Sequence, residues 1–307
     1  MLFNLILGIL LTSQNIVPGV PEDWYMSTTR LFEFCVDAKF DHPLCPPINQ
    51  SPDRERSVDG FVPTAPSGAL TSENLFKATV LYQMKQPPMA WLVGLKLSEA
   101  MPKNADERLW AEAQYLYARV LFDQRKYREA EAVLDRVVEV FKGKALYHQQ
   151  RAWVYFFTGK WDRALGSMVS AESSLIYPVP FFEKYFIRAL VERETCQWTK
   201  AFNTVAKGRE YLTNAQPDVG THPWVVLCEN RDLGAVCAKL RSFYQGYYTA
   251  QIKKALNDLD LVELEMKDRG VSQQQRASTS AIVWPFVGEA WQDELGYYSV
   301  PVRSQCG

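Results

Sequence analysis

The sequence predicts an all-α protein, an α-solenoid of four to five stacked helical hairpins, on the basis of three observations. Alanines recur in pairs separated by twelve residues, and the second and third pairs start 34 residues apart, a period typical of repeated helix–turn–helix units. Gly and polar residues separate segments in which apolar residues are spaced by three and four, as in paired helices. Small side chains are needed where two helices of a hairpin approach most closely. The pairs are Ala78/Ala90, Ala118/Ala130, Ala152/Ala164, Ala189/Ala201 and Ala238/Ala250.

The first residues of the chain resemble an export signal. Met1 to Leu11 carry only Asn4 among apolar and glycine residues. The run is shorter than the roughly 20 residues that span a bilayer, but it has the size of the apolar part of a secretory signal. We therefore expect residues 1–20 to direct export to a periplasm or to the exterior. The mature chain is then expected to have no integral membrane span. The alternative is a buried N-terminal helix.

An irregular arm is expected next, at residues 21–71. Eight prolines between Pro18 and Pro66 interrupt any long helix in this region. Helical patterns then begin near Ser72, and repeated hairpins are expected over 72–213. The clearest hairpins pair residues 106–124 with 128–141, 145–158 with 161–176, and 179–195 with 198–213.

The C-terminal third is predicted to contain an insertion and a degenerate hairpin at 214–270, followed by a capping tail at 271–307. Two helical patterns flank Gly246. A glycine inside a helix costs about 1 kcal/mol relative to alanine, which favours a turn at Gly246 over one long helix, although both remain open. The tail is rich in aromatic residues and is expected to cover an exposed apolar face of the last repeat.

The chain contains six cysteines, Cys35, Cys45, Cys196, Cys228, Cys237 and Cys306. In an exported protein an even number indicates disulfides, and the shortest loops would pair Cys35 with Cys45 and Cys228 with Cys237. The alternative is buried free thiols. No CxxC spacing is present, so no metal site of the zinc-ribbon type is predicted.

The block from Ala113 to Pro178 resembles the tetratricopeptide repeat family. The third repeat carries the residues of the family pattern: Ala152, Tyr155, Gly159, Trp161, Ala164, Met168 and Ala171. The second departs from the pattern with Arg125 at the turn, and the fourth departs with Glu192 and with Cys196 at the turn. The resemblance implies a right-handed α-solenoid. It assigns repeat packing to Ala118, Ala130, Ala152, Gly159, Ala164, Ala189 and Ala201.

In this family the first helix of each repeat lines a concave groove. The resemblance therefore implies a partner-binding surface of Tyr115, Arg119, Phe122, Gln149, Trp153, Phe156, Phe157, Phe186, Leu190 and Arg193. A protein or peptide partner with apolar anchors is expected there. The alternative is that the N-terminal arm or the C-terminal tail of the same chain fills the groove.

Charge and motifs argue against other classes of function. The net charge of −1 offers no electrostatic footprint for nucleic acid or an anionic membrane. The sequence contains three His and no HExxH, Walker A, GxGxxG or GxSxG motif, so neither an enzyme nor a bound cofactor is predicted. The expected function is a non-catalytic scaffold or adaptor of the cell envelope. The alternatives are an assembly factor for an outer-membrane machine and, in another class, a hydrolase or carbohydrate-active enzyme that uses the groove.

Overall fold

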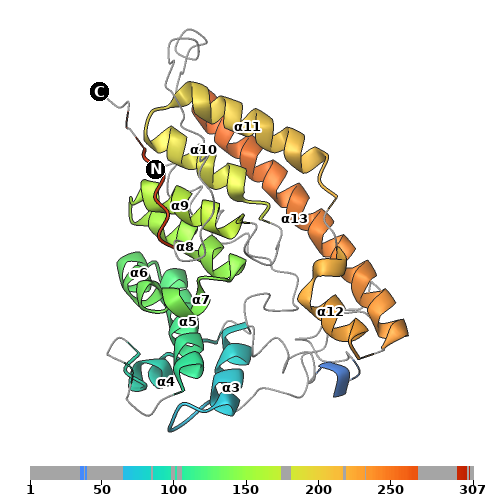
Figure 1. The fold of residues 1–307 in the computed structure, drawn as a ribbon. Helices are drawn as coiled ribbons and strands as arrows, with labels where there is room; N and C mark the ends of the chain where they lie inside the picture. Colours follow the sequence, from blue (N-terminus) through green and yellow to red (C-terminus); the bar gives the residue numbers. More distant parts are fainter. Residues whose placement is uncertain are drawn as a thin grey trace. The chain divides into compact units, whose positions relative to one another are not determined.

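The computed structural model describes residues 35–37, 39, 65–83, 86–97, 101, 106–173, 181–216, 219–231, 233–268, 296–302 and 304. Helices joined by turns and short irregular segments make up this part of the chain (Figure 1), which contains no β-strand, so the all-α prediction is confirmed. The expectations for residues 1–20, for most of 21–71 and for 271–295 lie outside the described residues. The chain divides into two compact units. Unit 1 comprises Met1–Val140 and Val219–Tyr244, and unit 2 comprises Phe141–Asp218 and Gln245–Gly307.

Unit 1 contains helices from two separate stretches of the sequence. The first stretch forms α3 (Ser72–Gln83), α4 (Met89–Gly94), α5 (Glu107–Asp123), α6 (Tyr127–Arg136) and the start of α7 (Val138–Phe141). α5 and α6 pack together as a hairpin, and α3 and α4 each contact α5. The second stretch forms η1 (Val219–Thr221), α12 (Pro223–Glu229) and the beginning of α13 (Gly234–Asp268).

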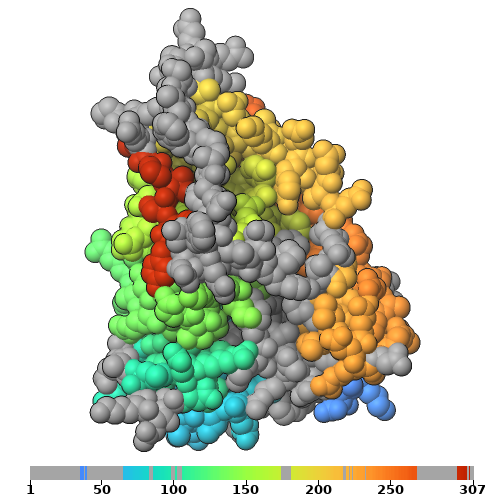
Figure 2. All heavy atoms as spheres, in the orientation of Figure 1, coloured from blue at the N-terminus to red at the C-terminus, as the bar shows by residue number. Residues whose placement is uncertain are grey.

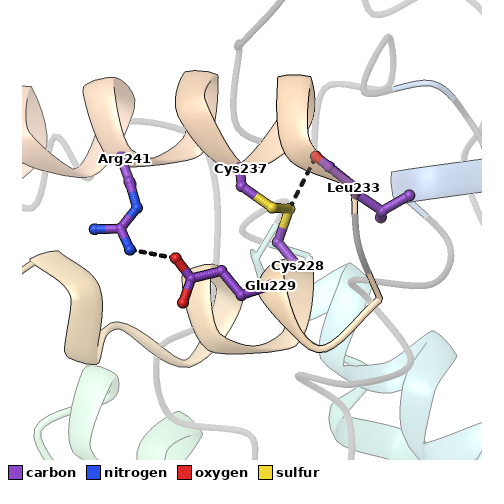
Figure 3. Close-up of a disulfide and its surroundings, with 5 residues drawn as sticks. All are labelled: Cys228, Glu229, Leu233, Cys237 and Arg241. Atoms are coloured by element: carbon purple, nitrogen blue, oxygen red, sulfur yellow. Dashed lines mark hydrogen bonds and ion pairs between the residues drawn. A yellow bond between two sulfur atoms is a disulfide. The ribbon is translucent and has the colours of Figure 1, made fainter.

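A disulfide joins α12 to α13 in unit 1. Cys228 and Cys237 are bonded with their Cα atoms 5.5 Å apart, as the sequence predicted (Figure 3). In the same view Arg241 of α13 reaches across to form an ion pair with Glu229 of α12. Cys35 and Cys196 each take part in a further disulfide, and no described cysteine carries a free thiol. Cys45 lies outside the described residues, so its predicted pairing with Cys35 stays a prediction.

Unit 2 contains two consecutive helical hairpins. α8 (Ala145–Phe157) packs on α9 (Trp161–Ala171), and α10 (Lys184–Glu194) packs on α11 (Trp198–Thr213). α10 also contacts both helices of the preceding hairpin. The part of α13 beyond Gln245 lies against α11, where Leu259 packs beside Gly208, and against α10, where Glu265 pairs with Arg193. Within the described ranges, no helix combines the length and the apolar character needed to cross a bilayer.

The turns of the hairpins share one backbone geometry. The second residue after each first helix has a positive φ, 63° at Arg125, 75° at Gly159 and 58° at Cys196. In each turn, the amide of this residue donates to the carbonyl three residues earlier, and the next amide donates to the carbonyl five residues earlier. This pair of bonds defines a Schellman motif, which satisfies the carbonyls left open at a helix end. The bonds that span five residues run from Lys126 to Leu121, from Lys160 to Tyr155 and from Gln197 to Glu192. Gln86 makes a bond of the same span to Leu81.

Burial separates the alanine pairs into two groups. Those of the three central hairpins are fully buried, as close helix contacts require: Ala118, Ala130, Ala152, Ala164, Ala189 and Ala201. Ala78 is buried as well, but its partner Ala90 is exposed. Ala238 and Ala250 are both exposed on α13. The twelve-residue spacing therefore marks close packing in the centre of the chain and has no such meaning in the last pair.

α13 is one continuous helix, which corrects the hairpin expected to turn at Gly246. Gly246 lies in its interior with open space around it. The cost of about 1 kcal/mol for this glycine is offset by apolar burial on either side, including Tyr244 and Tyr248. The last predicted repeat is thus replaced by a single long helix, the alternative that the sequence left open.

The described part of the C-terminal tail, residues 296–302, lies across α8 and α9 in unit 2. Tyr298 is buried against Ala145 and Val169. The backbone N–H of Gly296 donates to Ser170 Oγ at 3.0 Å, and Arg151 Nη1 donates to the Gly296 carbonyl oxygen at 2.7 Å. In Figure 2 the red atoms of this segment lie against the yellow-green surface of α9. This described segment therefore covers an apolar face on the first hairpin of unit 2.

Candidate functional site

The predicted groove residues are distributed over three helices and both units. α5 in unit 1 carries Tyr115, Arg119 and Phe122, of which Arg119 is half-buried and the aromatic residues are buried. In unit 2, α8 carries Gln149, Trp153, Phe156 and Phe157, and α10 carries Phe186, Leu190 and Arg193. Of these seven, only Gln149, Trp153 and Phe157 are half-exposed.

Arg119 is held in a local cluster in unit 1. Its guanidinium lies 5.2 Å from the ring centroid of Tyr82, on α3. The Tyr82 hydroxyl donates to Asp123 Oδ2 at 2.8 Å. Burial lowers the pKa of Arg119 to about 10, although the nearby Asp123 carboxylate partly opposes that shift. Burial, and then the charge and hydrogen bond of Asp123, raise the pKa of Tyr82 well above its ordinary value.

Four aromatic side chains of unit 2 form a connected cluster, which we call the aromatic platform: Trp153, Phe156, Phe157 and Phe186. The rings of Trp153 and Phe157 are nearly parallel, with an interplanar angle of 23° and centroids 6.0 Å apart. Phe156 and Phe186 meet Trp153 at 6.2 and 5.8 Å. The rings of Phe156 and Phe186 are buried, so the half-exposed surface of the platform consists of Trp153 and Phe157.

Polar contacts orient the indole of Trp153. Its Nε1–H donates to Glu183 Oε2 at 2.8 Å, and Lys254 Nζ on α13 donates to the other oxygen, Oε1, at 3.1 Å. Both oxygens of Glu183 are thus used within the chain. Burial lowers the pKa of Lys254, but the carboxylates of Glu183 and Asp258 outweigh burial and leave that pKa above its ordinary value. A hydrogen-bonded carboxylate and a fixed cation therefore lie at the edge of the platform.

Asp258 is the most perturbed carboxyl group beside the platform. It lies one turn beyond Lys254 on α13 and is 6% exposed. Burial raises its pKa to about 6, Lys254 acts in the opposite direction, and Glu183 adds to the rise. This group titrates in a range where the other carboxyl groups of most proteins are already ionised.

Arg193 has a structural role that differs from the expected one. Its guanidinium forms a buried ion pair with Glu265 of α13 and donates from Nε and Nη2 to Glu194 Oε1 at 3.0 and 2.6 Å. Its charge is therefore neutralised inside the chain. Leu190 is also buried. Neither side chain is exposed, and α13 supplies Arg193 with the kind of contact that a partner was expected to make.

Two residues of the site were missed in the sequence, Lys254 and Asp258. They belong to a helix that was interpreted as half of a separate hairpin, and nothing in the local pattern connects them to Glu183, 71 residues away from Lys254. Their i, i+4 spacing places Lys254 and Asp258 on one face of α13, and this spacing was the only feature of the sequence that could have indicated that they act together. Glu192 departs from the repeat pattern for a visible reason, since Thr204 Oγ1 donates to its Oε2 at 2.6 Å.

The histidines of the described region are used in structural contacts. Nε2 of His148 donates to the Lys142 carbonyl oxygen at 2.7 Å, and burial lowers the pKa of His148 to about 4. Nδ1 of His222 accepts the Trp224 amide at the start of α12. Among the described residues, no group of three or more His, Cys, Asp or Glu side chains is placed to hold a metal ion.

Comparison of the chain with protein-family models, with curated proteins and with solved structures yields no match.

Proposed function

We propose that this protein is a non-catalytic interaction scaffold, a right-handed solenoid of tetratricopeptide-like hairpins that binds a segment of another polypeptide. The repeated Schellman turns and the buried alanines of the central hairpins support the family assignment. The observation on which the function depends is the aromatic platform: two nearly parallel, half-exposed rings on α8, with the indole oriented by Glu183.

The platform is suited to an apolar side chain of a partner. The indole N–H already has an acceptor, so the half-exposed part of Trp153 offers mainly its ring surface. Aromatic side chains whose orientation is already set lose little conformational freedom on binding and dominate the affinity of many interfaces. Lys254 at the edge is paired with Glu183, so the platform offers a partner its ring surfaces rather than a free charge. The occupant we propose is therefore an apolar segment of a polypeptide.

Export to a periplasm or to the exterior is part of the same proposal. The disulfide between Cys228 and Cys237 supports it, because such bonds persist in oxidising compartments. The apolar character of residues 1–11 supports it independently. An envelope-assembly factor is a narrower version of this function. Enzymatic use of the groove is less well supported, since both oxygens of Glu183 already accept hydrogen bonds within the chain.

Crosslinking from defined positions tests the proposal. A photo-reactive amino acid at Gln149, one turn before Trp153 on α8, is expected to capture discrete partners in cells. The same amino acid at Asn203, exposed on α11, is the control and is expected to capture none of them. Identical products from both positions, or none from Gln149, would refute the groove as a binding surface.

A substitution at the platform gives a second test. Trp153→Ala should reduce the crosslinking yield from Gln149 strongly, because truncation of a central Trp typically costs about 2 kcal/mol or more of binding free energy. Trp153→Phe keeps an aromatic ring but loses the bond to Glu183, and an intermediate yield is expected. Circular dichroism of each variant separates loss of binding from loss of helix.

A further inference from the structure

Unit 2 contains a second candidate site, separate from the aromatic platform. A solvent-open cavity of about 740 Å³, shallow rather than enclosed, lies where the beginning of α10 meets the end of α11. Its volume lies within the roughly 300–1,000 Å³ that small-molecule sites occupy. No residue of the platform lines it, and neither the repeat pattern nor the proposed scaffold function assigns it a role.

The floor of the cavity is aromatic. The rings of Tyr185 and Tyr211 lie 5.3 Å apart at 48°, and Phe182 lines the same space. Tyr211 is 39% exposed, although large aromatic side chains are usually more buried. Lys184 holds this floor in place, since its ammonium group lies 4.2 Å from the Tyr211 centroid and bonds Glu172 at 2.5 Å.

The backbone of α11 comes unusually close to this floor. A Cβ on Gly208 would lie 2.7 Å from the Cβ of Tyr185, so any larger residue there would displace the ring. The base of the Tyr185 side chain therefore packs directly against the backbone of α11. The floor is preformed, which reduces the entropic cost of binding a ligand.

The rim of the cavity is polar and electrically balanced. Lys207 and Glu210 contribute one charge of each sign, and Asn214 and Gln216 contribute carboxamides that both donate and accept. Within the described part of the chain, the side chains of Glu210, Asn214 and Gln216 make no hydrogen bond to other residues. These groups are solvated and available to a ligand.

We propose that this cavity binds a neutral saccharide. A sugar ring has an apolar face of C–H groups, which packs on an aromatic ring, and hydroxyls at its edge, which need both donors and acceptors. Tyr211 and the rim supply these two features. A phosphorylated or carboxylated ligand would need an excess of positive charge on the rim, and a cationic ligand would compete with Lys184 for the Tyr211 ring.

Binding to the full chain can be measured by calorimetry and by saturation-transfer NMR with three probes, cellohexaose, maltoheptaose and chitohexaose. We expect at least one to bind, and we expect Tyr211→Ala to weaken its affinity by about fivefold to tenfold, the upper part of the range for one lost stacking contact. Tyr211→Phe should change it by less than about threefold. Tyr297→Ala, which removes an exposed tyrosine outside the cavity, should leave it unchanged.

Three results would overturn the proposal. One is the absence of binding by all three saccharides. Another is binding that Tyr211→Ala leaves unaffected in a variant with native helicity. The third is preferential binding of a proline-rich peptide that Tyr211→Ala abolishes, which would assign the cavity to a polypeptide. Trp153→Ala should not change saccharide affinity, so a failure of the platform and a failure of this cavity are distinguishable.

Discussion

The Cβ atom that Gly166 lacks would lie 1.8 Å from the carbonyl oxygen of Tyr298. The backbone of the C-terminal segment thus rests directly on α9, with no side chain between them. The Val300 amide donates to the Asp162 carbonyl at 3.1 Å, and Ser299 Oγ donates to Asp162 Oδ2 at 2.9 Å. A helical glycine is required here by a close approach rather than by its own backbone conformation.

Gly166→Ala is therefore expected to detach residues 296–302 from α8 and α9. The loss of their contacts should destabilise unit 2 by about 2 kcal/mol, the range of overpacked core sites, even though alanine favours a helix by up to about 1 kcal/mol. Hydrogen exchange at Gly296 and Val300 and the urea midpoint report the change. Gly246→Ala is the matched control, since it lies in open space inside α13 and should stabilise the protein. A stabilising Gly166→Ala would contradict the close contact.

The disulfide of unit 1 gives a second prediction. Replacing Cys228 and Cys237 together by alanine should reduce the free energy of unfolding by about 2–3 kcal/mol, as the entropy of a short closed loop suggests. Thermal melts measured with and without reductant check this value. Arg241→Ala removes only the partly exposed ion pair nearby and should cost less than about 1 kcal/mol. If the double variant melted like the parent, the bond would not constrain α12 and α13.

The turn geometry predicts two substitutions with opposite effects. Arg125 adopts a positive φ that favours glycine, so Arg125→Gly should stabilise the α5–α6 hairpin by roughly 0.5–1 kcal/mol. Gly159 adopts the same conformation in the next turn, so Gly159→Ala should destabilise α8–α9 by about 1 kcal/mol. Denaturant titration of both variants measures the two values. Shifts of the same sign would show that backbone strain does not control these turns.

The raised pKa of Asp258 predicts how stability depends on pH. Because burial raises this pKa from 3.8 to about 6, the folded state binds a proton more tightly than the unfolded chain. The contribution of Asp258 to the free energy of unfolding is fully present below pH 3.8 and is lost as the pH rises through about 6. Asn cannot ionise, so Asp258→Asn should avoid the cost of the buried charge and stabilise the protein at pH 8 by up to about 2 kcal/mol.

His148 makes the stability of the protein depend on pH in the opposite direction. Its pKa is lowered from 6.5 to about 4, so its contribution is present above pH 6.5 and is lost as the pH falls. Stability measured between pH 4 and 8 should therefore rise with pH more steeply in Asp258→Asn than in the parent. Asn257→Ala, an exposed neighbour, should keep the parental profile. Superimposable profiles of Asp258→Asn and the parent would rule out the perturbed carboxyl group.

Local patterns in the sequence were sufficient to predict the central hairpins and one disulfide. The Schellman turns involve bonds over only three and five residues, and the buried alanines repeat with the helix pairs, so both appear in the sequence as spacing. Cys228 and Cys237 are close in sequence for the same reason. The exposed Ala238 and Ala250 show where the same spacing has no structural meaning.

The candidate site was predictable only in part. Trp153 and Phe157 were expected on the groove, and both are half-exposed on α8. The bond of Lys254 to Glu183 and the ion pair of Arg193 with Glu265 both involve α13, which was expected to be two helices. The energetic preference against Gly246 inside a helix was real, but burial of neighbouring apolar residues outweighed it.

The amino-acid sequence by itself determined where the central hairpins and their turns lie and that their paired alanines are buried, because these depend on interactions between near neighbours. The tertiary structure alone decided that Arg151 holds Gly296, 145 residues away, and that Lys254 holds Glu183. Such pairings follow from which surfaces remain unburied after the hairpins form. They leave no periodic pattern in the chain, since a single hydrogen bond between distant segments requires no repeated residue.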